Sequence, residues 1–109
     1  MGEPLRVLVV DDSADDALLL AHALREGGYT PTMARVDTAD AMREALREPW
    51  DVILADYTMP RFSGPDALRL AQELGIDRPF IMVSGKQGEE TAVEVMRAGA
   101  HDYVMKSNL

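Results

Sequence analysis

The chain has 109 residues, which is enough for one domain with a single core and too few for two. It carries 19 acidic against 11 basic side chains, so its formal charge of −8 disfavours direct binding to nucleic acid or anionic membranes and favours divalent cations and basic partner surfaces. Cysteine is absent, which excludes disulfides and thiolate sites and is compatible with the cytoplasm. A hydrophobic content of 47% argues against disorder, and no apolar run approaches the roughly 18 residues of a membrane span.

Five apolar segments rich in branched side chains are expected to form buried strands. The second is weaker than the others because polar residues interrupt it. In chain order the strands are predicted at Leu5 to Val10, Thr32 to Val36, Trp50 to Ala55, Pro79 to Val83, and Tyr103 to Met105.

Four segments between these strands show helical spacing and residues typical of helix ends. In the first, Ser13 is a suitable N-cap, and Asp15 and Asp16 complement the positive end of the helix dipole. In the second, Asp37 is the expected cap and Pro49 the expected stop. The helices are predicted at Ser13 to Glu26, Thr38 to Glu48, Gly64 to Leu74, and Glu89 to Ala98.

Strands and helices alternate along the whole chain, which predicts a parallel sheet with helices on both faces. Right-handed crossovers make this a doubly wound α/β domain with a five-stranded sheet. Residues 1–109 are therefore expected to form one domain.

Polar and charged side chains stand where the expected strands end. Ligands of open α/β sheets bind beyond the carboxyl ends of the strands, so these groups are expected to converge at one edge. They are Asp11 and Asp12 after the first strand, Asp56 after the third, Ser84 and Gly85 after the fourth, and Lys106 after the fifth.

The three carboxylates of this set would repel one another without a cation. Oxygen ligands without Cys or His favour a hard ion, and a small open cluster suits Mg²⁺, with Mn²⁺ as the alternative. Lys106 and the Ser84 hydroxyl are suited to bind the oxygens of a phosphoryl group. In-line attack by Asp56, which forms an aspartyl phosphate, is the chemistry that follows.

Each of these residues also has a plainer interpretation. Asp11 and Asp12 could serve only as a turn before a helix, and Asp56 as an acid at a loop entry. Ser84 could mark a turn, and Lys106 could be a solvated surface lysine. The functional interpretation depends on the combination, because four strands each deliver a suitable group to the same end of the sheet.

Five motifs follow one another along the chain: Val7-Leu8-Val9-Val10-Asp11-Asp12-Ser13, Asp56-Tyr57-Thr58-Met59-Pro60 with Gly64, Val83-Ser84-Gly85, Gly99-Ala100-His101-Asp102-Tyr103, and Lys106. In this order, and with matching predicted structure, they resemble the receiver domain of two-component response regulators over the whole chain. The resemblance implies a flavodoxin-like sheet with strand order 2-1-3-4-5. It also implies a signalling domain rather than an enzyme acting on an external substrate.

The resemblance further assigns roles to single residues. The implied roles are phosphoacceptor for Asp56, phosphate-binding lysine for Lys106, and metal ligands for Asp11, Asp12, Asp56 and a backbone carbonyl of Tyr57 or Thr58. The family pattern favours the carbonyl of Thr58. Ser84 corresponds to the switch hydroxyl and Tyr103 to the switch aromatic, which together remodel the surface of the fourth helix and fifth strand on phosphorylation.

The implied partner is a histidine kinase or a phosphotransfer domain that donates the phosphoryl group from phosphohistidine. Sensor or kinase domains attached in a longer parent protein are a further expected partner class. By resemblance, a fifth helix should begin just after Asn108 and pack beside the first. The end of the chain at Leu109 is therefore interpreted as a receiver domain cut before its last helix, and the alternative is that an apolar strip stays exposed.

Two positions depart from the family pattern. Ser107 follows Lys106 where the family usually has proline, commonly with a cis peptide. Because a non-proline cis bond costs roughly 2.5–4 kcal/mol, a trans bond or a rearranged loop is predicted. Lys86 stands where the family often has a small residue, and together with Thr58 it is expected to alter the lifetime of the phosphoryl group.

Two other function classes are alternatives. One is a degenerate receiver that binds a partner without phosphorylation, which the intact acidic set disfavours. The other is a small phosphatase with an aspartyl intermediate, but that chemistry usually requires a second Asp two residues after the nucleophile, where this chain has Thr58. His22 and His101 have no neighbouring ligands at metal-binding spacing and are expected to pack or to face solvent.

Overall fold

The computed structural model describes residues 2–85 and 89–109. Its five parallel strands form one sheet in the order β2-β1-β3-β4-β5, which confirms the predicted topology. The strands are β1 (Glu3–Val10), β2 (Tyr29–Val36), β3 (Val52–Asp56), β4 (Phe80–Ser84) and β5 (Asp102–Met105).

Four α-helices and one short 3-10 helix connect or follow these strands in the described part of the chain. They are α1 (Ala14–Glu26), α2 (Ala39–Ala45), α3 (Gly64–Glu73), α4 (Glu89–Arg97) and the 3-10 helix η1 (Lys106–Asn108). The predicted N-cap of α1 is confirmed, because the Ser13 side chain accepts a hydrogen bond from the Asp16 N–H.

Helix α2 differs from the prediction at both ends. Its N-cap is Thr38 and not Asp37, because Thr38 has extended backbone and its Oγ1 accepts a 3.1 Å hydrogen bond from the Ala41 N–H. The helix also ends at Ala45, well before Pro49, so proline is not its immediate stop.

Strand β2 is longer than the sequence predicts. It begins at Tyr29 and pairs with β1 over eight residues, from Glu3 opposite Tyr29 to Val10 opposite Val36. Pro31 is tolerated because β2 lies at the edge of the sheet, where one side of the strand needs no ladder partner.

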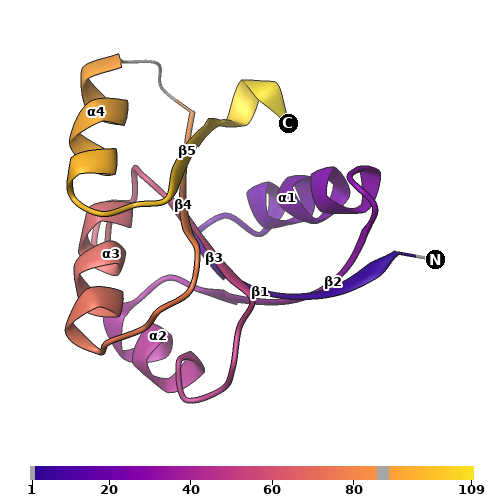
Figure 1. Cartoon of the computed structure of the whole chain (residues 1–109), viewed down its shortest axis with the longest axis horizontal. Helices are drawn as coiled ribbons and strands as arrows, with labels where there is room; N and C mark the ends of the chain where they lie inside the picture. The colour runs from indigo at the N-terminus through magenta and orange to yellow at the C-terminus, as the bar shows by residue number, and fades with distance from the viewer. Residues whose placement is uncertain (1, 86–88) are drawn as a thin grey trace.

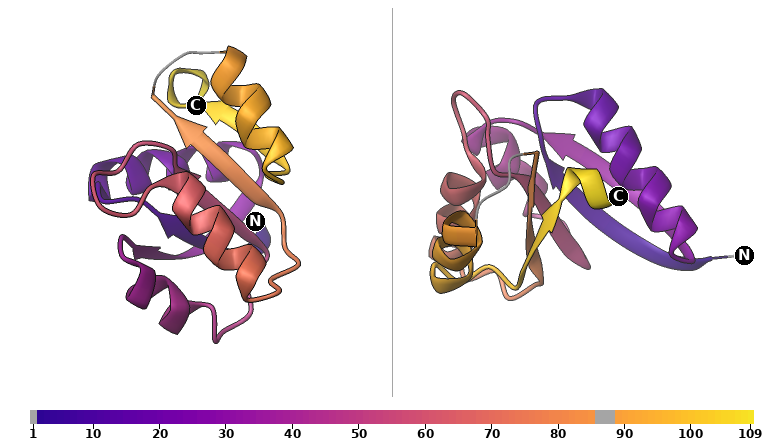
Figure 2. Two further views of the ribbon diagram at one scale, coloured as in Figure 1. Left: turned by 90° about the vertical axis from the view of Figure 1, so that its left-hand side faces the viewer. Right: turned by 90° about the horizontal axis from the view of Figure 1, so that it is seen from above.

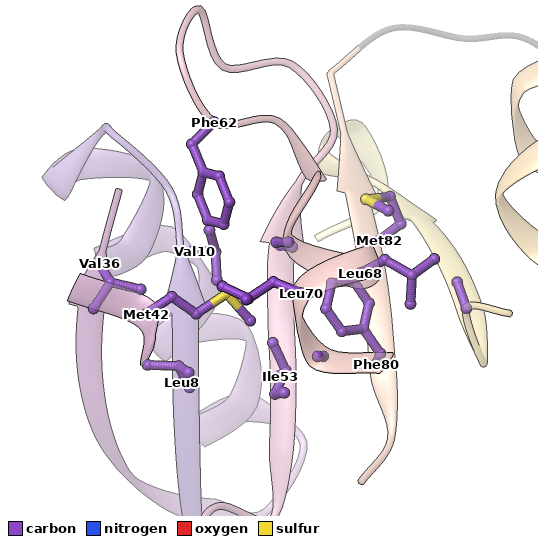
Figure 3. Close-up of a cluster of buried hydrophobic side chains, with 14 of the residues drawn as sticks. Leu8, Val10, Val36, Met42, Ile53, Phe62, Leu68, Leu70, Phe80 and Met82 are labelled. Atoms are coloured by element: carbon purple, nitrogen blue, oxygen red, sulfur yellow. The ribbon is translucent and has the colours of Figure 1, made fainter. Parts of the chain in front are cut away.

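The sheet separates two helical layers: α1 lies on one face, and α2, α3 and α4 cover the other (Figure 1). The larger core lies under α2, α3 and α4, where Leu8, Ile53 and Met82 of the sheet pack with Met42 and Leu68 of the helices (Figure 3). The smaller core lies under α1 and contains these six buried residues: Val7, Val9, Leu20, Val52, Leu54 and Val83.

The turn η1 that follows β5 lies on the same side of the sheet as α1 (Figure 2, right). This placement brings the end of the chain near the start of α1, although the two segments are far apart in sequence. No helix among the described residues is long and apolar enough to cross a membrane.

Candidate functional site

The expected groups do meet at the carboxyl edge of the sheet. Asp56 and Ser84 are the last residues of β3 and β4, while Asp11 and Lys106 directly follow β1 and β5. Lys106 Nζ lies 3.3 Å from Asp56 Oδ2 and 3.6 Å from Asp11 Oδ2. The order of the strands therefore builds the site, since β1 and β4 both flank β3 in the sheet.

Three carboxylates form a compact acidic cluster at this edge. Asp11, Asp12 and Asp56 each offer an oxygen, and these oxygens all lie within 4.8 Å of one another. Asp11 and Asp56 are only 1% and 8% exposed, whereas Asp12 faces solvent. An ion could therefore reach the cluster from the side of Asp12 while the other two carboxylates hold it from within.

Asp11 is held at its backbone and at one of its two side-chain oxygens. Its Oδ1 accepts a 2.9 Å hydrogen bond from the Ser13 N–H, and its carbonyl accepts one of 3.2 Å from Arg35 Nη1. Oδ2 is buried without a hydrogen-bond partner, and burial raises the pKa of Asp11 above its ordinary value. A hard divalent cation would satisfy this oxygen and remove the cost of the buried charge, so the donor set fits Mg²⁺.

Lys106 carries the positive charge of the site. Its side chain is only 18% exposed, and that burial acts to lower its pKa. A hydrogen bond to Asp16 and the charges of Asp11 and Asp56 outweigh burial, so the pKa of Lys106 is raised overall. The ammonium therefore stays protonated. The Lys106–Ser107 peptide is trans, which confirms the prediction made from the missing proline.

The loop after β3 is fixed by its backbone. The Thr58 N–H donates to Asp56 Oδ1 at 3.3 Å, so one carboxylate oxygen of Asp56 faces this loop and the other faces Lys106. The Tyr57 carbonyl accepts a hydrogen bond of 3.4 Å from the Gly64 N–H. The assignment of the metal-binding carbonyl to Thr58 stays a prediction.

The two expected switch residues lie on neighbouring strands. Ser84 ends β4 and is 1% exposed, and it pairs in register with Met105, the residue before Lys106. Tyr103 is partly buried against the larger core. Lys86, to which an effect on phosphoryl lifetime was assigned, lies outside the described residues.

Sequence analysis missed Asp16, which was assigned only to the helix dipole. Its Oδ2 accepts a 2.6 Å hydrogen bond from Lys106 Nζ, the shortest contact of that ammonium. His101 Nδ1 accepts a hydrogen bond from the Phe80 N–H, and His22 is exposed, with Nε2 3.7 Å from Glu26 Oε1. The sequence spacing of Asp16 does not indicate this contact, because Asp16 occupies the same helix position as Asp66 of α3, which closes a capping box.

Comparison with known sequences points in one direction. Residues 7–108 match the sequence model of the family described as the response regulator receiver domain. The chain is 34% identical over 105 residues to the probable transcriptional regulatory protein TcrX of Mycobacterium tuberculosis. It is 33% identical over 104 residues to the phosphate regulon transcriptional regulatory protein PhoB of Klebsiella pneumoniae. These matches cover 96% and 93% of this chain but only 44% of each relative, so the chain spans less than half of their length.

Solved structures give the same fold. The receiver domain of the Francisella response regulator 1452 has a TM-score of 0.77 at 28% identity, with 94% of this chain and 84% of that chain covered. The receiver domain of the histidine kinase CKI1 from Arabidopsis thaliana, complexed with Mg²⁺ and BeF₃⁻, has a TM-score of 0.71 at 30% identity. That match covers 94% of this chain and 81% of that one.

Proposed function

Because the chain belongs to the family of response regulator receiver domains, we propose that Asp56 accepts a phosphoryl group from the phosphohistidine of a histidine kinase or phosphotransfer domain. One observation carries this proposal: the only lysine at the sheet edge in the described chain, Lys106, lies 3.3 Å from Asp56 Oδ2 while Asp11 and Asp12 complete an acidic cluster around the same carboxylate. The proposed nucleophile, a cationic side chain and the proposed metal ligands therefore lie side by side at the carboxyl ends of the strands.

The reaction is a direct transfer between two side chains. A carboxylate oxygen of Asp56 attacks phosphorus in line, the new P–O bond forms as the P–N bond breaks, and the imidazole nitrogen keeps the electron pair of the broken bond. Lys106 binds a phosphoryl oxygen, and the Ser84 hydroxyl donates to another. Because the acceptor is the domain's own side chain, the domain switches state and turns over no external substrate.

The acidic cluster suits Mg²⁺, with Mn²⁺ as the alternative. Asp11, Asp12, Asp56 and the Thr58 carbonyl would hold the ion, and the ion would neutralise the carboxylates and polarise a phosphoryl oxygen. The similar CKI1 receiver domain was solved with Mg²⁺ and BeF₃⁻, which supports this choice.

The consequence of phosphorylation is a change in a partner-binding surface. Ser84 ends β4 and Tyr103 lies in β5 beside it, so a movement of the Ser84 hydroxyl towards the phosphoryl group would reach Tyr103 and the surface of α4 and β5. The net charge of −8 supports a domain that acts on proteins and does not itself contact nucleic acid or membranes. With a histidine kinase as partner, we expect the domain to act in the cytoplasm. Sensor or kinase domains of a longer parent protein are further expected partners. No feature of residues 2–85 and 89–109 favours a binding module that works without phosphorylation.

The test is labelling with a small phosphodonor such as acetyl phosphate. The wild-type chain should be phosphorylated with Mg²⁺ and not with a chelator, and Asp56→Asn should not be phosphorylated under either condition. Asp77→Asn is the matched control, because Asp77 is exposed and precedes β4 at the opposite edge of the sheet. Equal labelling of wild type and Asp56→Asn would rule out Asp56 as the acceptor.

A further inference from the structure

Helices α1 and α3 begin with the same sequence pattern, a serine followed three residues later by an aspartate. In α1 the Ser13 Oγ accepts a 3.1 Å hydrogen bond from the Asp16 N–H, and in α3 the Ser63 Oγ accepts one of 3.3 Å from the Asp66 N–H. Both serines are therefore N-caps of the same kind.

The aspartate side chains of the two helices do different things. Asp66 Oδ2 accepts a 3.1 Å hydrogen bond from the Ser63 N–H and so completes a capping box. At the start of α1 the return bond does not form, because the Ser13 N–H donates to Asp11 Oδ1 instead. The metal-site residue Asp11 thus replaces Asp16 in the cap and leaves the Asp16 carboxylate available to another donor.

That donor is Lys106. Its Nζ lies 2.6 Å from Asp16 Oδ2, closer than to Asp56 Oδ2 at 3.3 Å or to Asp11 Oδ2 at 3.6 Å. The pair joins α1 to the residue directly after β5, across ninety positions of sequence. It is also partly shielded, since the side chains of Lys106 and Asp16 are 18% and 37% exposed.

Lys106 needs such a support. A lysine stem has many rotamers, and freezing them opposes any contact that the ammonium makes. Here the residue begins a short 3-10 helix, its peptide to Ser107 is trans, and Ser107 and Asn108 are exposed. The exposed neighbours Ser107 and Asn108 do not hold the ammonium, whereas Asp16 fixes the charged end of the side chain.

We propose that Asp16 is a positioning residue, whose carboxylate holds the Lys106 ammonium beside Asp56 where it can bind the incoming phosphoryl group. The inference rests on the proposed function, because it concerns the same reaction. An ammonium has three N–H donors, so one bond to Asp16 leaves two for Asp56 and a phosphoryl oxygen. The Asp16 carboxylate hydrogen-bonds to Lys106 and lies outside the acidic cluster, although its charge contributes to the raised pKa of Asp11.

The experiment compares Asp16→Ala and Asp16→Asn in the wild-type chain and in the Lys106→Ala chain. The readouts are the rate constant of phosphorylation by acetyl phosphate at saturating Mg²⁺ and the affinity for beryllofluoride. In the wild-type background Asp16→Ala should lower both by about fivefold to tenfold, the scale of one charged and partly exposed hydrogen bond. Asp16→Asn, which keeps an acceptor oxygen, should recover part of the loss.

In the Lys106→Ala background, removal of Asp16 should change neither readout by more than about twofold, because the residue through which it acts is gone. If Lys106→Ala does not fold, Lys106→Met keeps the length of the stem and provides the second background. Asp15→Asn is the matched control, since exposed Asp15 neighbours Asp16 and alters the same helix dipole.

The outcomes separate the two proposals. If wild type is labelled on Asp56 but Asp16→Ala keeps its full rate, or loses equally with and without Lys106, the proposed function stands and the role of Asp16 is refuted. If wild type takes up no phosphoryl group, the proposed function fails and the role of Asp16 fails with it. A loss that requires Lys106 and is partly restored by Asp16→Asn supports the inference.

Discussion

Lys106 Nζ lies 3.6 Å from Asp11 Oδ2, within the range of an ion pair but beyond that of a hydrogen bond, so the buried oxygen of Asp11 keeps no hydrogen-bond partner. The native state without metal therefore contains a carboxylate whose charge is incompletely compensated. Burial raises the pKa of Asp11, which means that folding disfavours its ionised form. Folding favours a neutral side chain at position 11, whereas the proposed Mg²⁺ site requires the carboxylate.

The first prediction concerns Asp11→Asn. Without divalent ions the variant should have a higher free energy of unfolding than wild type, by about 1 kcal/mol, because it removes a buried charge while its Oδ1 can still accept from Ser13. Urea denaturation in chelator measures this difference. Mg²⁺ should then stabilise wild type and not the variant. Asp12→Asn is the control, since Asp12 is exposed and its loss should matter less without metal. A variant less stable than wild type in chelator would contradict the argument.

The second prediction concerns the capping box of α3 and its pH dependence. Hydrogen bonds from the backbone and side chain of Ser63, with support from Arg69, lower the pKa of Asp66 below its ordinary 3.8. Its stabilising effect should therefore be complete above about pH 4 and decline as the pH falls through the lowered pKa. Asp66→Ala should cost about 1 kcal/mol at pH 7. The difference in the free energy of unfolding between Asp66→Ala and wild type, measured by urea denaturation, should become smaller only in strong acid.

Asp40→Ala serves as the control for that experiment. Asp40 also lies in the first turn of its helix and pairs with an arginine three residues later, but it is exposed and closes no capping box. Its removal should cost less than about 0.5 kcal/mol. Equal losses in the two variants would show that the box itself contributes nothing.

The third prediction concerns Gly64, which packs directly against the loop after Asp56. A Cβ at this position would lie 2.7 Å from the Asp56 carbonyl oxygen and would also clash with Met82 Sδ. Gly64→Ala should therefore lower stability by about 1–3 kcal/mol and slow phosphorylation, because the end of β3 must shift. Gly27→Ala is the matched control: its nearest contact would be 3.4 Å, so stability should change little. An unchanged phosphorylation rate in Gly64→Ala would show that the loop accommodates the methyl group.

The fourth prediction concerns Trp50, which lies at the amino ends of the strands, opposite the candidate site at their carboxyl ends. Trp50 Nε1 donates a 2.8 Å hydrogen bond to the Ala45 carbonyl at the end of α2, and Arg6 lies over its ring. Trp50→Phe removes the hydrogen bond and should lower the free energy of unfolding by about 1 kcal/mol, measured by circular dichroism in urea. Phosphorylation should be unaffected, because Trp50 precedes β3 while Asp56 ends it. Slower phosphorylation of Trp50→Phe would show that a change at the start of β3 affects the site at its end.

Much of the site follows from the sequence because strand ends are easy to locate. Asp11, Asp56, Ser84 and Lys106 each follow or end an apolar run, and parallel strands bring their carboxyl ends to one edge. Local propensity failed where tertiary structure decides. The strand predicted from Thr32 begins at Tyr29 instead, because residues 29–31 pair with residues 3–5 of β1.

The role of Asp16 could not be predicted from sequence. Ser13 and Asp16 have the same spacing as Ser63 and Asp66, and both patterns favour a closed capping box. The difference arises from Asp11, which takes the Ser13 N–H, and from Lys106, which lies ninety residues away in sequence and adjacent in space. Neither fact is local to the helix.

Strand β5 is an edge strand of four residues, and Lys106 directly follows it. A short edge strand has few neighbours to hold it, so we expect β5 and the adjoining Lys106 to open more readily than the central strands. A ligand that binds the Lys106 ammonium should therefore also stabilise the pairing of β5 with β4. Amide hydrogens of β5 should therefore exchange more slowly when beryllofluoride is bound. Ligand binding at the site would then be measurable as an increase in the local stability of the fifth strand.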